Sequence, residues 1–224
     1  YFVGVPSLMG FDTSDRPLFT IAIPSYNREE SLKEILASYL SQCFCDFEII
    51  IGNDYLDKTL TCKRLSVGHD PRVRIINNAK NLGELENMNF LLSQARGQYF
   101  TWQFDDDPCS DLFLTEVEKT IKLFDSPDSI FSSFETIYGN KEKKFQFNEK
   151  NPSLCFTGHD FVNKYLNKEV TVLGCCGFYR LDFLKSLGGV TRLSSSPIAL
   201  FSEYLLLVQQ ISAEKVVYID NPLV

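Results

Sequence analysis

The sequence lacks a long apolar stretch and the glycine-rich motifs of two large nucleotide-binding classes. Its uncharged runs, such as residues 170–179 and 204–213, are far shorter than the ~18 apolar residues of a membrane-spanning helix. We therefore expect no membrane span within residues 1–224. Neither Gly-x-Gly-x-x-Gly after the first predicted strand nor a Gly-x-x-x-x-Gly-Lys loop occurs, which disfavours a dinucleotide oxidoreductase and a P-loop enzyme.

The sequence also lacks a cysteine framework and an excess of basic residues. Its seven cysteines are scattered without a Cys-x-x-Cys pair, which disfavours a zinc site and a disulfide-stabilised fold. The one Asn-x-Ser/Thr sequence, at 151–153, has proline in the middle. We therefore expect a reducing, cytoplasmic setting, with any attachment to the inner face of the membrane residing outside residues 1–224. A net charge of −7 argues against a nucleic-acid partner.

What is present is the composition of a globular α/β protein, with 44% hydrophobic and 23% charged residues. Short β-branched runs predict strands at 19–23, 47–52, 73–77, 99–104, 129–138 and 215–219. Helical periodicity predicts helices near 31–40, 85–95, 113–124, 158–166 and 201–211, and another that ends at Gly188 and Gly189. Ser31 and Glu34 have the spacing of a capping box. A polar segment at 139–150 is interpreted as an insertion. The order predicts a mostly parallel central sheet flanked by helices.

Acidic side chains follow two of the predicted strands. Asp54 comes after the second strand, and Asp105, Asp106 and Asp107 come after the fourth, where ligands of open α/β sheets bind. Three adjacent carboxylates repel one another, and no Lys or Arg lies nearby in the sequence. A divalent cation such as Mg²⁺ or Mn²⁺ would remove this conflict, and Mg²⁺ is often shared between carboxylates and phosphates. The alternative is a solvated turn, with Asp111 capping the next helix.

Five motifs in register resemble those of the family 2 glycosyltransferases, which have the GT-A fold. They are Ile-Ala-Ile-Pro-Ser-Tyr-Asn-Arg at 21–28, Phe-Glu-Ile-Ile-Ile-Gly-Asn-Asp at 47–54, Asn-Leu-Gly at 81–83, Ala-Arg-Gly-Gln-Tyr at 95–99 and the aspartates at 105–107. Leu-Gly-Gly at 187–189 and Ser-Glu-Tyr at 202–204 continue the resemblance. It implies one GT-A domain over residues 1–224, with a donor half at about 17–107 and an acceptor half at about 108–224.

The resemblance also implies roles for individual residues. The residues matching the nucleotide-binding positions are Pro24, Ser25, Tyr26, Asp54 and Asp105. Those matching the metal ligands, for Mn²⁺ or Mg²⁺, are Asp106 and Asp107. Glu203 matches the general base. The expected reaction is inverting transfer of a sugar from a nucleotide-diphosphate donor, with UDP expected, to a hydroxyl on a glycan or lipid-linked acceptor in bacterial polysaccharide or glycoconjugate assembly. The alternative is a catalytically weak nucleotide-sugar-binding module of a larger glycan-assembly protein.

The sequence departs from the family pattern at several positions, and one departure is Tyr55-Leu56 in place of the familiar Gly-Ser. Asn53 stands where relatives commonly have the first of two acids, and Gln103 stands where many have the first acid of Asp-Ala-Asp-Asp. Ser202 precedes Glu203, so the acceptor helix carries one acid where the family has a pair. Tyr26 and Trp102 are aromatic residues at strand ends, which either flank a base or sugar or belong to the core.

Overall fold

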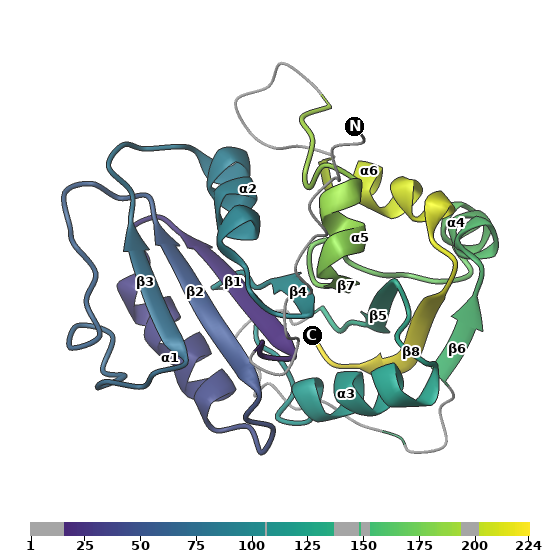
Figure 1. Ribbon diagram of the computed structural model, residues 1–224, viewed down its shortest axis with the longest axis horizontal. Helices are drawn as coiled ribbons and strands as arrows, with labels where there is room; N and C mark the ends of the chain where they lie inside the picture. Colours follow the sequence, from purple (N-terminus) through teal and green to yellow (C-terminus); the bar gives the residue numbers. More distant parts are fainter. Residues whose placement is uncertain (1–15, 106, 137–147, 149–152, 194–201) are drawn as a thin grey trace, which may run out of the picture.

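The computed structural model describes residues 16–105, 107–136, 148, 153–193 and 202–224. Within these residues eight strands form one sheet in the order β3-β2-β1-β4-β7-β5-β8-β6 (Figure 1). The strands are β1 (Phe19–Ser25), β2 (Phe47–Asn53), β3 (Val73–Asn77), β4 (Tyr99–Trp102), β5 (Ser129–Ser133), β6 (Ser153–Phe156), β7 (Phe178–Arg180) and β8 (Val216–Pro222).

The sheet is mixed, with a parallel half that carries most of the predicted motifs. β1 pairs in parallel with β2 and β4, β2 pairs in parallel with β3, and β5 pairs in parallel with β8. The antiparallel strand β7 joins β4 to β5, and β6 lies antiparallel to β8 at the other edge. β1 and β2 are buried along almost their whole length, as expected of strands covered on both faces. The predicted α/β class is thus confirmed.

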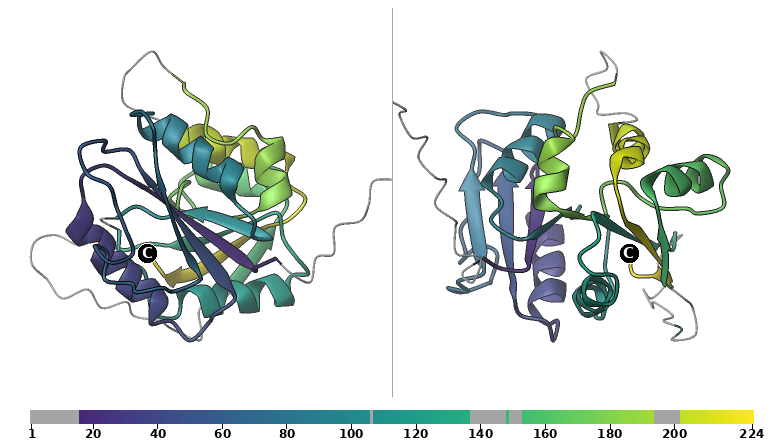
Figure 2. Two further views of the ribbon diagram at one scale, coloured as in Figure 1. Left: turned by 60° about the vertical axis from the view of Figure 1, so that its left-hand side comes forward. Right: turned by 45° about the vertical axis from the view of Figure 1, so that its right-hand side comes forward.

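Helices cover both faces of the sheet (Figures 1 and 2). α1 (Glu29–Leu40) and α3 (Phe113–Leu123) pack on one face, where their apolar residues meet the side chains of Phe19, Ile21 and Ile23. The other face is covered by α2 (Glu84–Gln94), α4 (Gly158–Leu166), α5 (Leu181–Ser186) and α6 (Ser202–Val208). α6 continues as a 3₁₀ helix over Gln209–Ser212. In the described part of the chain, no helix is sufficiently long and apolar to span a membrane.

A buried carboxylate ties the parallel strands together. Glu48 of β2 is 3% exposed and accepts hydrogen bonds from Arg96 Nη2 at 2.6 Å and Thr20 Oγ1 at 2.8 Å. Burial raises the pKa of Glu48, but the hydrogen bonds from Arg96 and Thr20 outweigh it, and the net pKa is lowered. Glu48 is therefore ionised in the folded protein at neutral pH, and its charge is balanced by Arg96 and Arg74.

Several sequence-based boundaries are corrected by the structure. α1 begins at Glu29 after Arg28, with no side-chain cap, so the capping box at Ser31 and Glu34 was wrong. α3 follows Leu112, also without a side-chain cap, so Asp111 does not cap it. β5 ends at Ser133 instead of residue 138, and β6 and β7 were not predicted because each has only three or four residues. The polar insertion predicted at 139–150 lies outside the described residues except for Asn148.

Candidate active site

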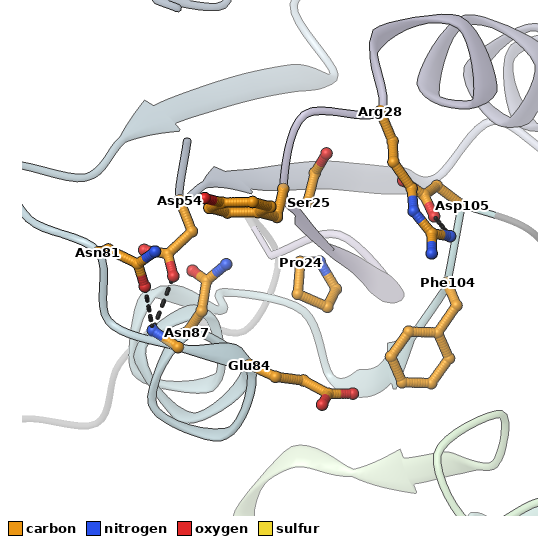
Figure 3. A pocket seen from close by; sticks show the side chains of 11 residues that line it. Pro24, Ser25, Arg28, Asp54, Asn81, Glu84, Asn87, Phe104 and Asp105 are labelled. Carbon is orange, nitrogen blue, oxygen red and sulfur yellow. Dashed lines mark hydrogen bonds and ion pairs between the residues drawn. The ribbon is translucent and has the colours of Figure 1, made fainter. Parts of the chain in front are cut away.

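A cavity of about 710 Å³ opens where β1, β2 and β4 end (Figure 3). This is the edge at which open α/β sheets bind their ligands. Its wall comes from the last residues of β1, from the segments that follow β1, β2, β3 and β4, and from the first two turns of α2: Pro24, Ser25, Tyr26, Arg28, Asp54, Asn81, Gly83, Glu84, Asn87, Phe104 and Asp105. The structure therefore brings together all five residues predicted to bind nucleotide, which are separated by up to 81 positions in the sequence.

Asp54 holds one wall of the cavity. Its Oδ1 accepts hydrogen bonds from the backbone N–H of Leu82 at 2.7 Å and from Asn78 Nδ2 at 3.0 Å, and its Oδ2 accepts one from Gly83 N–H at 2.7 Å. Gly83 has φ +82°, a left-handed conformation that glycine adopts without strain. A carboxylate offers about four acceptor positions, so Asp54 can fix this loop and still accept one more hydrogen bond.

Asn53 explains why an amide replaces the expected acid next to Asp54. Its Nδ2 donates to Asn77 Oδ1 and to the carbonyl oxygen of Lys58, both at 2.8 Å, and to the carbonyl of Tyr55 at 3.3 Å. A carboxylate has no hydrogen to donate to these three oxygens. Asn53 therefore supports the loop behind the cavity wall, and this departure from the family pattern has a structural cause.

Asn87 is a second buried amide that the sequence reasoning missed. It is 2% exposed, donates to the carbonyl of Gly52 at 2.9 Å and accepts from Asn78 Nδ2 at 3.1 Å. A Cβ on Gly52 would lie 2.4 Å from Asn87 Oδ1, so only glycine allows this approach. The α-helical spacing of Leu85, Met88 and Leu92 identifies α2 but gives no sign that Asn87 faces the end of β2.

The end of β1 contributes a hydroxyl without a described partner, and the loop after it contributes an exposed aromatic ring. Ser25 is 5% exposed, and its Oγ has no hydrogen-bond partner among the described residues although it lines the cavity. Tyr26 is 55% exposed and makes an edge contact with Tyr55 at 5.3 Å between ring centroids. Trp102, in contrast, is fully buried and donates to the carbonyl of Met88 at 3.1 Å. Of the two aromatics considered, Tyr26 lines the cavity and Trp102 belongs to the core.

Asp105 and Arg28 form the opposite wall of the cavity (Figure 3). Arg28 Nη1 donates to Asp105 Oδ1 at 3.0 Å, and the Asp105 side chain is 6% exposed against 52% for Arg28. The sequence placed no cation near the aspartates, but the fold brings Arg28 to them from 77 residues away. Arg28 follows Asn27, whose φ of +56° turns the chain into α1. Its place directly after the Ser-Tyr-Asn motif was the signal that could have identified it.

The aspartates after β4 fit a cation held jointly with a ligand. Asp105 and Asp107 are described, and Asp106, the first predicted metal ligand, lies outside the described residues. Where side chains are described, no three Asp, Glu, His or Cys residues converge as a complete metal cage. One or two carboxylates, completed by phosphate oxygens and water, are the usual ligands of Mg²⁺. The hard oxygen donors of this loop therefore fit Mg²⁺ or Mn²⁺ shared with a phosphorylated ligand.

Glu203, the predicted base, lies half-buried in the first turn of α6. Burial raises its pKa, and the negative charges of Asp107 and Glu84 raise it further. Such contributions require Asp107 and Glu84 each to lie within electrostatic range of Glu203. The first turn of α6 therefore shares an acidic environment with Asp107 after β4 and with Glu84 of the cavity wall. Glu84, on the first turn of α2, was not predicted as a site residue.

The glycine-rich turn at 174–177 packs directly against the first turn of α6. A Cβ on Gly174 would lie 2.7 Å from the carbonyl oxygen of Glu203, so only glycine allows the turn to approach this closely. The buried hydroxyl of Tyr179 donates to the carbonyl of Gly174. The backbone that carries Glu203 is thus held by a turn that leads into β7 of the central sheet.

Comparisons with known proteins agree with this arrangement. Residues 20–188 match the family model described as "Glycosyl transferase family 2". An uncharacterized glycosyltransferase of Haemophilus influenzae is 30% identical over 115 residues, which are 51% of this chain and 35% of that protein. The chondroitin synthase of Pasteurella multocida is 37% identical over 92 residues, 41% of this chain and 9% of that protein. The chain thus spans about a third or less of the length of these curated relatives.

Solved structures share the fold at low sequence identity. S. aureus TarS 1-349 in complex with UDP superposes with a TM-score of 0.66 and 18% identity, covering 90% of this chain and 57% of that chain. The mannosyltransferase PcManGT from Pyrobaculum calidifontis, in complex with GDP-Man and Mn²⁺, gives a TM-score of 0.59 and 13% identity, covering 94% and 56%. These similarities confirm the predicted GT-A type of fold.

Proposed function

The chain belongs to glycosyl transferase family 2, and from this membership we propose that it transfers a sugar from a nucleotide-diphosphate donor to an acceptor hydroxyl with inversion. The observation that carries the proposal is the cavity of about 710 Å³ at the carboxyl ends of β1, β2 and β4. Its volume suits a small-molecule ligand. Its lining combines an exposed ring, a hydroxyl that no described residue bonds, a guanidinium and carboxylates.

The nucleoside is proposed to bind between the loop after β1 and the Asp54 wall. Tyr26 offers an exposed ring for contact with the base, and Ser25 Oγ offers a hydrogen bond that no described residue takes. The remaining acceptor position of Asp54 suits an N–H group of a base such as uracil or guanine. We propose UDP as the nucleotide, supported by the UDP bound to TarS, whereas PcManGT carries GDP-Man.

The diphosphate is proposed to bind at the Arg28 and Asp105 wall. A bound Mn²⁺ or Mg²⁺, held by Asp106 and Asp107, would stabilise negative charge on the departing diphosphate. Arg28 adds a charge-assisted donor on the same side of the cavity. Asp105 orients Arg28 and is proposed to contact the ribose and diphosphate.

Glu203 is proposed to act as general base. Its carboxylate takes the proton of the acceptor hydroxyl as that oxygen bonds to the anomeric carbon, while the bond from this carbon to the diphosphate oxygen breaks. The raised pKa of Glu203 makes it a stronger base than an exposed glutamate, which favours proton transfer near neutral pH. One carboxylate suffices for a single displacement, so the lone acid at Ser202–Glu203 is compatible with turnover.

The acceptor is proposed to be a glycan or a lipid-linked sugar used in bacterial polysaccharide or glycoconjugate assembly. The name of the Pasteurella chondroitin synthase supports this assignment. We propose that donor and acceptor halves, about 17–107 and 108–224, act as one domain. All seven cysteines are free, which supports a proposed location in the reducing cytoplasm.

A donor screen tests the proposed function. The chain is incubated with UDP-, GDP- and dTDP-sugars, Mn²⁺ and candidate glycan acceptors, and release of the nucleoside diphosphate is measured. We expect release with one nucleotide class, largely lost in Glu203→Gln. Nucleotide binding without transfer or donor hydrolysis throughout the screen would support the binding-module alternative.

A further inference from the structure

Two fully buried side chains connect α1 to the loop that carries the aspartates. Tyr39, on the buried face of α1, is 0% exposed, and its hydroxyl donates to Gln103 Oε1 at 2.6 Å. Gln103 is 1% exposed and comes directly after β4. Its own backbone N–H donates to the carbonyl of Ala22 in β1 at 2.9 Å. Gln103 is therefore fixed both to the sheet and to the helix beneath it.

The amide of Gln103 holds both sides of the turn that contains the acidic residues. Nε2 donates to the carbonyl oxygen of Phe104 at 2.8 Å and to that of Asp107 at 2.5 Å. If the amide were reversed, its oxygen would face these two carbonyl oxygens, so they determine its orientation. A carboxylate at this position could not donate to either of them. The hydroxyl of Tyr39 donates a hydrogen bond to the remaining polar atom of this amide, Gln103 Oε1.

The end of α1 and Gln42, two residues beyond it, hold the loop at a second point. Ser38 Oγ lies 3.8 Å from Cys109 Sγ, and Gln42 Nε2 donates to this sulfur at 3.6 Å. Gln42 Oε1 also accepts from the N–H of Leu114 at 3.0 Å, at the start of α3. Ser38, Tyr39 and Gln42 thus fix the chain on both sides of Asp105 and Asp107.

We propose that Tyr39 and Gln103 are positioning residues that hold the aspartate loop in the conformation that binds the donor's metal-diphosphate group. The inference rests on the proposed function, because it assigns that ligand to the loop. Neither side chain is among the residues that line the cavity, so both act through the backbone carbonyls of Phe104 and Asp107. Residues that orient metal ligands from behind typically contribute 10–100-fold to metal affinity.

A pair of matched substitutions tests the proposal. Tyr39→Phe removes the hydroxyl that bonds Gln103. Tyr99→Phe removes the hydroxyl of another buried tyrosine, 2% exposed, which donates to the carbonyl of Pro127 at 2.8 Å at the opposite end of β4. Gln103→Glu removes both loop hydrogen bonds with little change of shape, and Gln103→Met does so without adding a charge.

Two measurements are made on each variant. The first is Mn²⁺ binding in the presence of UDP, detected by electron paramagnetic resonance. The second is amide hydrogen exchange of residues 104–110 without metal. We expect Tyr39→Phe and both Gln103 variants to bind Mn²⁺ about tenfold more weakly or worse and to exchange faster in this loop. Tyr99→Phe should match the wild type in both measurements.

The two proposals fail in different ways. If wild-type protein shows no UDP-dependent Mn²⁺ binding, the metal-dependent part of the proposed function is wrong. Amide hydrogen exchange of residues 104–110 then still decides whether Tyr39 and Gln103 hold the backbone of this loop. If the wild type binds Mn²⁺ and the Tyr39 and Gln103 variants behave like Tyr99→Phe, the positioning role is wrong. Should Gln103→Glu fail to fold, Tyr39→Phe and Gln103→Met decide the result.

Discussion

Arg28 Nη1 donates a 3.0 Å hydrogen bond to Asp105 Oδ1 across one end of the cavity. Arg28 provides the one positive charge among the described lining residues, whereas Asp54, Glu84 and Asp105 are acidic. The anionic diphosphate of the proposed donor would need cations in such a cavity, and a metal ion together with Arg28 would provide this charge balance.

Replacing Arg28 should therefore weaken donor binding. A hydrogen bond to a charged group contributes about 1.5–3 kcal/mol, so Arg28→Gln should raise the KM for the donor roughly 10- to 100-fold. Steady-state kinetics at varied donor concentration would measure this. Arg64→Gln is the control, because Arg64 pairs with Glu29 on the surface and does not line the cavity. Equal KM values for the two variants would exclude a donor role for Arg28.

Glu203→Gln should reduce turnover and leave donor binding intact. Loss of a general base costs about 10²- to 10⁴-fold in rate, so kcat should fall in that range while UDP affinity stays near the wild-type value. Single-turnover transfer and UDP titration would separate the two effects. Glu169→Gln, which changes an exposed acid paired with Lys164, should retain full activity. A Glu203→Gln variant with near-normal turnover would mean that another group accepts the proton.

The pH dependence of transfer should reflect the acidic surroundings of Glu203. Its pKa is raised by burial and by Asp107 and Glu84, and only the ionised form accepts a proton. The rate should therefore fall, as the pH decreases, at a pH above the ordinary glutamate value of 4.5. Glu84→Gln removes one like charge, which lowers the pKa of Glu203 and moves this fall to lower pH.

A matched control for the pH profile is Glu86→Gln. Glu86 lies two residues away on α2 and pairs with Arg192 on the surface at 3.4 Å, and it does not contribute to the raised pKa of Glu203. Its kcat profile should coincide with that of the wild type. Identical profiles for Glu84→Gln and Glu86→Gln would show that Glu84 does not influence the base.

Much of this site follows from the sequence because the parallel half of the sheet is built from local patterns. β1 is an apolar run followed directly by a polar loop, and β2 is an apolar run followed directly by an acid. α4 has the predicted bounds of residues 158–166. Strand order then brings the ends of β1, β2 and β4 together. The carboxylates at these ends, Asp54 and Asp105, could therefore be placed by chemistry and position, whereas Ser25 was identified through the family resemblance.

The remaining features depend on contacts between distant residues. Arg28 meets Asp105 across 77 positions, and Tyr39 meets Gln103 across 64. The roles of Asn53 and Gln103 become clear only when the carbonyl groups around them are located. β6 and β7 are too short to produce a periodic signal, and their pairing comes from the neighbouring strands β8, β4 and β5.

The buried ion pair of Glu48 should govern part of the acid stability. Glu48→Gln should lower the free energy of unfolding by about 1.5–3 kcal/mol at neutral pH, measured by urea denaturation. Because folding lowers the pKa of Glu48, its stabilising effect is present above 4.5 and is lost as the pH falls through the folded-state pKa. The difference between wild type and variant should therefore shrink in acid.

The control for this prediction is Glu30→Gln, since Glu30 forms an exposed pair with Lys33 at 2.7 Å. Exposed pairs contribute about 0–1 kcal/mol, so this variant should remain close to wild type at every pH. A Glu48→Gln variant that was equally unaffected would show that Arg96 and Arg74 do not stabilise the folded state through Glu48.

Calorimetric titration of UDP, GDP and dTDP, each with Mn²⁺ and with a chelator, tests the central claim most directly. We predict that one nucleotide, with UDP expected, binds with heat that depends on Mn²⁺, and that Asp106→Asn and Asp107→Asn each weaken this binding. If none of the three nucleotides gave metal-dependent heat with the wild-type chain, the assignment of the aspartate loop and its cavity to a metal-bound nucleotide diphosphate would be contradicted.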